Sequence, residues 1–238
     1  MKTLGLLTAT FLLLSFNSST LNLEKKIAIN VSEPSALSFS IDKKTLFTVS
    51  DSDGSIHQLD LNGKTIKVIK TKASDLEGIV FHPDLNGYCI TEERIRKISC
   101  FDLNGILIKS KSIAFPGSSN AGFEGITYNS LNKHFYVVNE KKPTAILELD
   151  TDLNVIKTIN FSHLLDLSDI TYDEEENKFY ILSHESQKII STDHLFNVEN
   201  TFSIPSVIQA EGLVVDKINR KIYVVSDKDS TFNTFTLN

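Results

Sequence analysis

Short apolar runs separated by turn residues fill the chain from about residue 25 to its end. One kind of run begins with an aromatic residue and is apolar on both faces. Its five copies begin at Phe47, Tyr88, Tyr136, Tyr180 and Tyr223. A strand with two apolar faces suits a sheet packed between other sheets better than a sheet with one wet face. The pattern therefore predicts an all-β protein built of stacked sheets, with the leading aromatic residues in its core.

A second kind of run precedes each of these and carries the motif Glu-Gly-Ile or Glu-Gly-Leu. The clearest copies are Asp75–Phe81, Gly122–Tyr128 and Gln209–Val215, and looser copies are Glu33–Phe39 and Asp166–Tyr172. The third residues of the five copies are Ser35, Glu77, Glu124, Ser168 and Glu211, spaced by 42, 47, 44 and 43 residues. A period in the low forties is typical of propeller blades. We therefore predict a five-bladed β-propeller with four-stranded antiparallel blades.

The fifth unit contains only three runs, at 211–215, 221–226 and 231–237, before the chain ends. The alternating segment Lys25–Asn30 can supply its missing outer strand. Such a closure joins the first and last blades and removes the open sheet edges that invite aggregation. The N-terminal strand is therefore expected to close the last blade.

Aspartates recur before the turn between the third and fourth strands of a unit, at Asp60, Asp102, Asp150 and Asp193. An Asp at such a position usually hydrogen-bonds its own backbone, so we interpret these residues as structural rather than as metal ligands. Asp51–Gly54 resembles the start of a calcium-binding loop, but Asn62 stands where a bidentate Glu should close it. This segment is predicted to be a turn.

The N-terminus differs from the rest of the chain. Lys2 is followed by an apolar run from Leu4 to Phe16 and by the small polar residues Asn17–Thr20. This order is that of a secretory signal, and the apolar run is short for a membrane span. We predict a signal peptide at 1–22, a single propeller domain at 23–238, and export to the periplasm or cell envelope. An uncleaved membrane anchor is the alternative.

The net charge of −6 provides no basic surface that would bind nucleic acid or anionic lipid. The expected partners are a small-molecule ligand or an envelope protein, and we expect a monomer.

Cys89 and Cys100 lie on consecutive predicted strands of a hairpin. They pair if the turn is centred on residues 93–95, and a one-residue slip would leave two buried thiols.

Propeller geometry points to one place for a site. The first strand of a blade lines the channel, and the second strand runs antiparallel to it, so the start of one lies beside the end of the other. The starts carry Ser35, Glu77, Glu124, Ser168 and Glu211, and the ends carry Asp51, Glu92, Glu140, His184 and Asp227. Five blades thus bring ten positions to one mouth of the channel.

A ring of carboxylates without counter-charge raises carboxylate pKa values and destabilises a fold. A hard divalent cation relieves this repulsion, and calcium accepts irregular oxygen geometry best. We therefore predict Glu77, Glu124 and Glu211 as metal ligands, with calcium as the cofactor. On the alternative interpretation, each Glu accepts backbone N–H groups from a neighbouring blade and never meets a ligand.

These blade starts, together with Leu182-Ser-His-Glu-Ser186, resemble the SdiA-regulated (YjiK-like) family from Leu23 to Asn238. The resemblance implies an exported or envelope-associated propeller whose biochemical role is poorly defined. The chain is more remotely similar to phytase-like esterases and calcium-dependent lactonases. That similarity implies metal ligation by the glutamates of the three Glu-Gly motifs. His184 departs from the expected Asp, and Glu185 is the substitute ligand at this blade.

Three functional hypotheses follow. The first is an exported module that binds calcium or a small ligand at the mouth; Asp51, Glu92, Glu140, His184, Glu185 and Asp227 are its ligand-binding candidates. The second is a metal-dependent hydrolase of phosphoesters or lactones, with His184 or Glu92 as candidate base. The third is a scaffold that holds a partner on one face. No nucleophile or other catalytic residue can be assigned from spacing.

Overall fold

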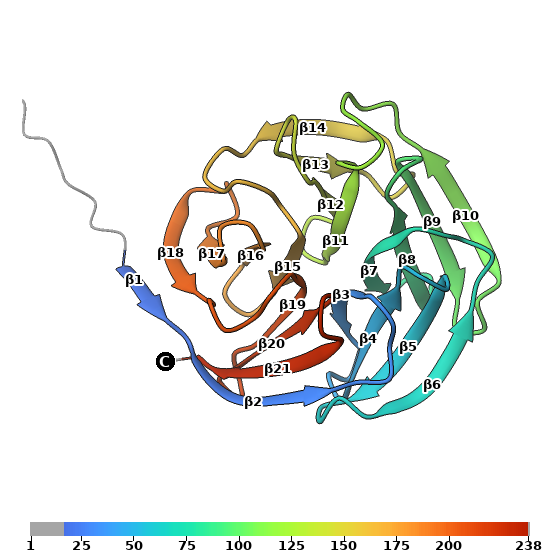
Figure 1. The fold of residues 1–238 in the computed structure, drawn as a ribbon. Coiled ribbons are helices and arrows are strands. Elements are labelled where there is room, and N and C mark those ends of the chain that lie inside the picture. The colour runs from blue at the N-terminus through green and yellow to red at the C-terminus, as the bar shows by residue number, and fades with distance from the viewer. Residues whose placement is uncertain (1–16, 238) are drawn as a thin grey trace, which may run out of the picture.

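The computed structural model of this chain describes residues 17–237. Residues 1–16, which hold the apolar run of the predicted signal segment, lie outside the described residues, as does Asn238. The described part contains strands and turns but no helix, and therefore none that could cross a membrane. Its five sheets are arranged radially around a common centre (Figure 1). The predicted five-bladed β-propeller is confirmed.

In each blade four strands follow one another in order from the innermost to the outermost. The innermost strands are β3 (Pro34–Phe39), β7 (Leu76–His82), β11 (Phe123–Asn129), β15 (Asp169–Asp173) and β19 (Ala210–Asp216). The second strands are β4 (Thr45–Ser50), β8 (Gly87–Glu92), β12 (His134–Asn139), β16 (Lys178–Ser183) and β20 (Lys221–Ser226). The third strands are β5 (Ser55–Asp60), β9 (Lys97–Asp102), β13 (Ala145–Leu149), β17 (Lys188–Thr192) and β21 (Thr231–Thr236). The outermost strands are β6 (Thr65–Lys70), β10 (Leu107–Ser112), β14 (Val155–Asn160), β18 (Val198–Ser203) and β2 (Asn22–Ala28).

The N-terminal strand closes the ring as predicted. β2 pairs antiparallel with β21, with Ile27 opposite Phe232, so the fifth blade is built from both ends of the described chain. The strand begins at Asn22 rather than at Lys25. Closure through a hydrogen-bonded sheet ties the first and last blades together without a further element.

The core consists of five apolar clusters, one between each pair of neighbouring blades. The aromatic residues at the heads of the second strands lie in these clusters and are at most 5% exposed. Across one interface the rings of Phe47 and Tyr88 lie 4.6 Å apart, and across another those of Tyr136 and Phe179 are equally close. The prediction that these residues are core residues is confirmed.

Two local predictions are also settled. The four turn aspartates accept backbone N–H groups within their own turns: Asp60 from Asn62 and Lys64, for example, with the same pattern in the other three. Their structural role is confirmed. Cys89 and Cys100 lie opposite each other on β8 and β9 and form a disulfide, which the sequence had left open.

One strand was not predicted. β1 (Asn17–Thr20) pairs parallel with β18 and adds a fifth strand to the fourth blade, at the outer edge seen in Figure 1. Leu21, between β1 and β2, is 6% exposed and belongs to the apolar cluster between the fourth and fifth blades. Both lie on the N-terminal side of the predicted boundary after residue 22. The signal peptide at 1–22 stays a prediction.

We expect Leu21→Ala to lower the free energy of unfolding by about 2 kcal/mol, because it leaves a cavity in a closed apolar cluster. Urea denaturation of a chain that begins at Asn17 measures this loss. A chain that begins at Leu23 should lose at least as much, since it lacks both β1 and Leu21. Equal midpoints for the two chain lengths would show that the segment contributes nothing to the fold.

Candidate functional site

The repeated blade start is a bulge in the innermost strand. Pairing of the first two strands shifts register near Ser35, Gly78, Gly125 and Gly212 in four of the five blades. A bulge re-aims the side chains beside it, and here the glutamate before each glycine reaches the mouth of the channel. Backbones crowd closely at the same place. A Cβ on Gly212 would lie 2.5 Å from the carbonyl carbon of Ala36 in the next blade.

In the fourth blade the position of the glycine is taken by Asp169, and this blade has no bulge. Its carboxylate is fully buried at the channel axis. One oxygen accepts the N–H of Ile170 at 2.8 Å, and the other accepts those of Leu213 at 2.7 Å and Leu37 at 3.4 Å. Asp169 therefore ties its own blade to the fifth and first blades. Burial raises its pKa well above the usual range.

The acidic mouth is a cavity of about 260 Å³ at the starts of the innermost strands. It is lined by Glu33, Ser35, Asp51, Glu77, Glu124, Glu140, His184, Gln209, Glu211 and Asp227. Seven of the nine predicted site residues are in this set, including all three predicted metal ligands. The two that are not are Glu92 and Glu185. Glu33 and Gln209, the first residues of the first and fifth copies of the motif, also line the mouth but were not predicted as site residues.

The second blade illustrates a one-residue difference in register. Glu92 is 3% exposed and accepts hydrogen bonds from Ser99 at 2.6 Å and Lys97 at 2.9 Å, within its own blade. Glu93, which follows β8, is the residue whose N–H bonds to the preceding blade start, as Asp51 and Asp227 do elsewhere. The aromatic residue of this blade stands one place earlier in its strand. Counting from it therefore selected Glu92, whose side chain lies on the opposite face.

Burial and mutual repulsion perturb the mouth carboxylates. The pKa values of Glu77 and Glu124 are raised well above the usual range, first by burial and then by nearby carboxylates. Burial raises the pKa of Glu211 to about 7. Within residues 17–237, none of these three carboxylates accepts a backbone N–H, and no hydrogen bond serves that of Glu124. The alternative interpretation had each glutamate accept backbone N–H groups from a neighbouring blade. Asp169 makes such contacts instead.

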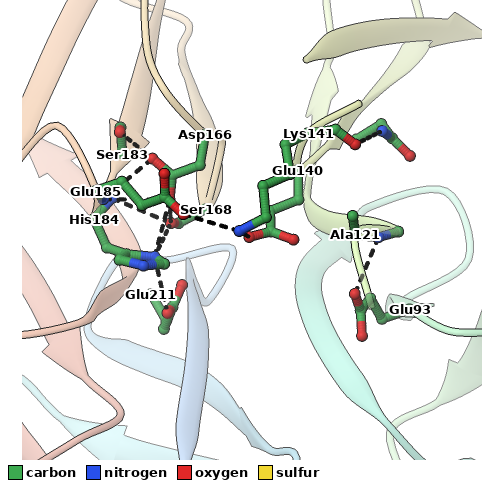
Figure 2. A network of polar contacts seen from close by, with 12 residues as sticks. Glu93, Ala121, Glu140, Lys141, Asp166, Ser168, Ser183, His184, Glu185 and Glu211 are labelled. Atoms are coloured by element: carbon green, nitrogen blue, oxygen red, sulfur yellow. Dashed lines mark hydrogen bonds and ion pairs between the residues drawn. The ribbon is translucent and has the colours of Figure 1, made fainter. Parts of the chain in front are cut away.

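One side of the mouth holds a hydrogen-bonded histidine (Figure 2). The Nδ1 atom of His184 lies 2.9 Å from Asp166 and 3.3 Å from Glu211. Asp166 is fully buried and also accepts a hydrogen bond from Ser183. The bond to Asp166 raises the pKa of His184 to about 9, so the imidazole is a cation at neutral pH. Asp166, the first residue of the fourth blade-start motif, was missed because only the third residue of each motif was followed.

Lys141 joins the third and fourth blades at the rim. Its ammonium lies 2.6 Å from Glu140 and 2.9 Å from Glu185, and Figure 2 shows it reaching between them. Glu185 is therefore paired at the rim rather than free in the cavity. Three triads have ligand atoms within 4.8 Å of one another around the mouth: Asp51, Asp75 and Glu77; Glu93, Glu124 and Glu140; Asp166, His184 and Glu185.

Of these triads, the last contains a cationic imidazole, whereas the first two consist of carboxylates alone. Arg94 pairs with Asp75 in the first triad, and Lys141 pairs with Glu140 in the second. Asp51, Glu77, Glu93 and Glu124 have no ion-pair partner among the described residues, and of these four the pKa values of Glu77 and Glu124 are raised most strongly. Carboxylates of this kind suit a hard divalent cation bound through oxygen.

The fold and this mouth define a five-bladed β-propeller with an acidic channel entrance. The family model of SdiA-regulated proteins matches residues 13–236, and the chain belongs to that family. The resemblance inferred from the blade starts is thereby confirmed.

Solved structures with the same fold share little sequence with this chain. A Bacteroides caccae protein of unknown function is 9% identical with a TM-score of 0.58, and the match covers 81% of this chain and 70% of the Bacteroides chain. A streptogramin B lyase is 16% identical with a TM-score of 0.53, at 90% and 72% coverage. Virginiamycin B lyase from Staphylococcus aureus is 16% identical with a TM-score of 0.54, at 90% and 73% coverage. At such identities the likeness concerns the fold alone.

Proposed function

We propose that this protein binds a calcium ion in its acidic mouth and acts as an exported module that recognises a small ligand or an envelope protein there. The observation that carries the proposal is the state of Glu77 and Glu124. Both are largely withdrawn from water, both have strongly raised pKa values, and neither has a cationic partner in the described part of the chain. Such a pair is costly unless a cation neutralises it.

Calcium fits the donor set better than magnesium does. The lining offers seven carboxyl groups, one hydroxyl and one side-chain amide from four blades and the loops before them. Calcium accepts six to eight oxygens in irregular arrangements, whereas magnesium demands a near-octahedral set. The cavity of about 260 Å³ also leaves room for water or for a ligand oxygen beside the ion. His184, as a cation, favours an ion on the opposite side of the mouth, near Glu77 and Glu124.

Export is supported by the cysteines. The disulfide between Cys89 and Cys100 is fully buried, and disulfides of this structural kind persist in oxidising compartments. Together with the predicted signal segment, it favours the periplasm or the cell envelope. Secretion assayed with a fused reporter, with and without residues 1–16, tests this part of the proposal.

Melting temperature with excess calcium and with chelator tests the metal site. A ligand that binds only the folded state stabilises it by RT ln(1 + [L]/Kd), so we expect a rise of several degrees with calcium. In Glu77→Gln/Glu124→Gln the calcium-dependent rise should vanish while the chelated protein melts no lower, because two unpaired acids have been neutralised. Glu185→Gln, at the rim, is the matched control. Equal rises in all three proteins would refute a site at these glutamates.

The calcium effect should depend on pH with a definite sign. The raised pKa values mean that the folded apo protein holds more protons than the unfolded chain, so its stability falls as pH rises from about 4.5 towards 7. Calcium must displace those protons, and its affinity should increase over the same window. We expect the calcium-induced rise in melting temperature to be larger at about pH 8 than at about pH 5. A pH-independent rise would point to a different site.

A second candidate function is metal-dependent hydrolysis of an ester, lactone or phosphomonoester. The observation that favours it is the Asp166–His184 pair beside the mouth. Because the pKa of His184 is about 9, the imidazole would serve as a general acid towards a leaving group rather than as the base expected from the sequence. Glu92 is turned into its own blade. A substrate screen with added calcium, repeated with His184→Gln, tests this function, and absence of turnover would count against it.

A further inference from the structure

A second cavity of about 210 Å³ lies at the opposite end of the channel, where the innermost strands finish. Four aromatic residues line it. Each stands four residues after the third residue of its blade-start motif: Phe39, Phe81, Tyr128 and Tyr172. The fifth blade has Val215 there. Leu37, Ile79, Ile126 and Ile170 also line the cavity, at an aliphatic level of the channel between the two ends. This aromatic end is therefore distinct from the acidic mouth.

The aromatic walls are held in place by neighbouring rings. Tyr128 lies 5.1 Å from Phe135 and Tyr172 lies 5.1 Å from Phe179, ring centre to ring centre. Phe81 makes an edge contact with Tyr88 at 5.9 Å. Rings fixed in this way lose little entropy when a ligand binds, which favours recognition by a preorganised site.

An acid at the aromatic end has an unused oxygen. Asp173 is 7% exposed and lines the cavity. Its Oδ1 accepts the N–H of Glu175 at 3.1 Å, but its Oδ2 has no hydrogen-bond partner among residues 17–237. Burial also raises its pKa. This oxygen is itself covered by protein atoms, so a cation in the cavity would stabilise the carboxylate by charge attraction rather than by direct contact.

The fifth blade shows which hydrogen bonds Asp173 lacks. Asp216 occupies the same repeat position, and its two oxygens accept the N–H and the side-chain amide of Asn219 at 2.9 and 2.8 Å. In the fourth blade the residue three places after Asp173 is Glu176, which cannot donate and instead pairs with Lys217 at 3.2 Å. The free oxygen is therefore a specific feature of the fourth blade rather than of the turn.

The charge around the cavity favours a cation. Glu174 lines it beside Asp173, and Lys43, the basic residue in the lining, is paired with Glu175 at 3.2 Å. Aromatic walls next to an acid are the environment in which organic ammonium ions are held, because ring faces attract cations that carry little hydration. The volume of about 210 Å³ is below the usual range for drug-sized ligands, so the occupant must be small.

We propose that the aromatic end of the channel binds a small organic ammonium ion, with the cation against the aromatic walls and beside Asp173. This site is independent of the calcium site, because different residues at opposite ends of the same strands form the two.

Titration calorimetry and saturation-transfer NMR with choline and tetramethylammonium test the proposal, and 3,3-dimethylbutan-1-ol serves as the uncharged isostere of choline. We expect saturable binding of both ammonium ions to the wild-type protein. The isostere should bind at least about tenfold more weakly, since it lacks the charge. Asp173→Asn should weaken choline binding by a similar factor while keeping the oxygen that accepts the Glu175 N–H. Asp216→Asn, at the equivalent turn, should leave binding unchanged.

Two results would overturn the proposal. One is the absence of saturable binding of either ammonium ion by the folded wild-type protein at millimolar concentrations. The other is equal affinity for choline and its uncharged isostere, which would make the cavity a general apolar site. Glu77→Gln/Glu124→Gln should retain choline binding, so failure of the calcium site and failure of this site are distinguishable.

Discussion

Asp169→Ala should lower the free energy of unfolding by about 4 kcal/mol, which makes it the most damaging single change that we expect in this protein. The carboxylate is fully buried and accepts three backbone N–H groups from three blades. Each donor left buried without a partner costs about 1–3 kcal/mol, and relief of the buried charge offsets part of the sum. Alanine is smaller than aspartate, and Asp169 is not among the residues with positive φ, so the substitution introduces neither a clash nor backbone strain. The loss therefore reports on the hydrogen bonds rather than on a clash.

Asp150→Ala is the matched control. Asp150 also accepts two backbone N–H groups, from Asp152 and Asn154, but it lies in a partly exposed turn, so water can replace it. Urea denaturation should show a much smaller shift of the midpoint for this variant than for Asp169→Ala. Comparable shifts would mean that the axis of the channel is wet and that Asp169 is not the tie between blades.

Much of the fold was predictable because every blade of a propeller has the same packing requirements. Each blade needs the same apolar second strand and the same crowded blade start, so motifs such as Glu77-Gly78 and Glu124-Gly125 recur at a readable period. The lone strand at the N-terminus had one possible place, the blade that lacked its fourth strand. The convergence of carboxylates at one mouth followed from the direction of the strands.

The details of the site depend on contacts between blades, which a period does not encode. Asp169 stands in the frame of a glycine, yet it supplies the buried acceptor for backbone donors of distant blades. The glutamates stand one place before that glycine, and they have raised pKa values and no backbone hydrogen-bond partner among the described residues. Glu92 was predicted at the position that Glu93 occupies, because the aromatic residue of this blade stands one place earlier in its strand. A repeat thus predicts where groups gather, while local register decides which of them face the cavity.

The N-terminal strand β1 was missed for a different reason. Asn17–Thr20 is polar and lacks the alternation that marks a half-buried strand, so nothing in its pattern distinguished it from the exit of a signal segment. It is held by parallel pairing with β18 and by the burial of Leu21. Edge strands of this kind are recruited by an available partner edge rather than by their own apolar residues.

The second large effect that we expect is on the disulfide. Cys89→Ala/Cys100→Ala should lower the free energy of unfolding by about 3 kcal/mol, because a bond between residues 11 apart restricts the unfolded chain. Both sulfurs are fully buried in the apolar cluster between the second and third blades, so reductant cannot reach them while the protein is folded. The native protein should therefore resist reductant.

Guanidinium denaturation with and without reductant gives the decisive measurement. Without reductant the midpoint of the wild-type protein should exceed that of the double alanine variant. With reductant, which reaches the cysteines once the chain unfolds, the wild-type midpoint should fall close to that of the variant, while the variant itself should not respond. Equal midpoints without reductant would show that the purified protein carries two thiols. Because a buried structural disulfide needs an oxidising compartment to form, that outcome would also remove one of the two supports for export and leave the N-terminal segment as the other.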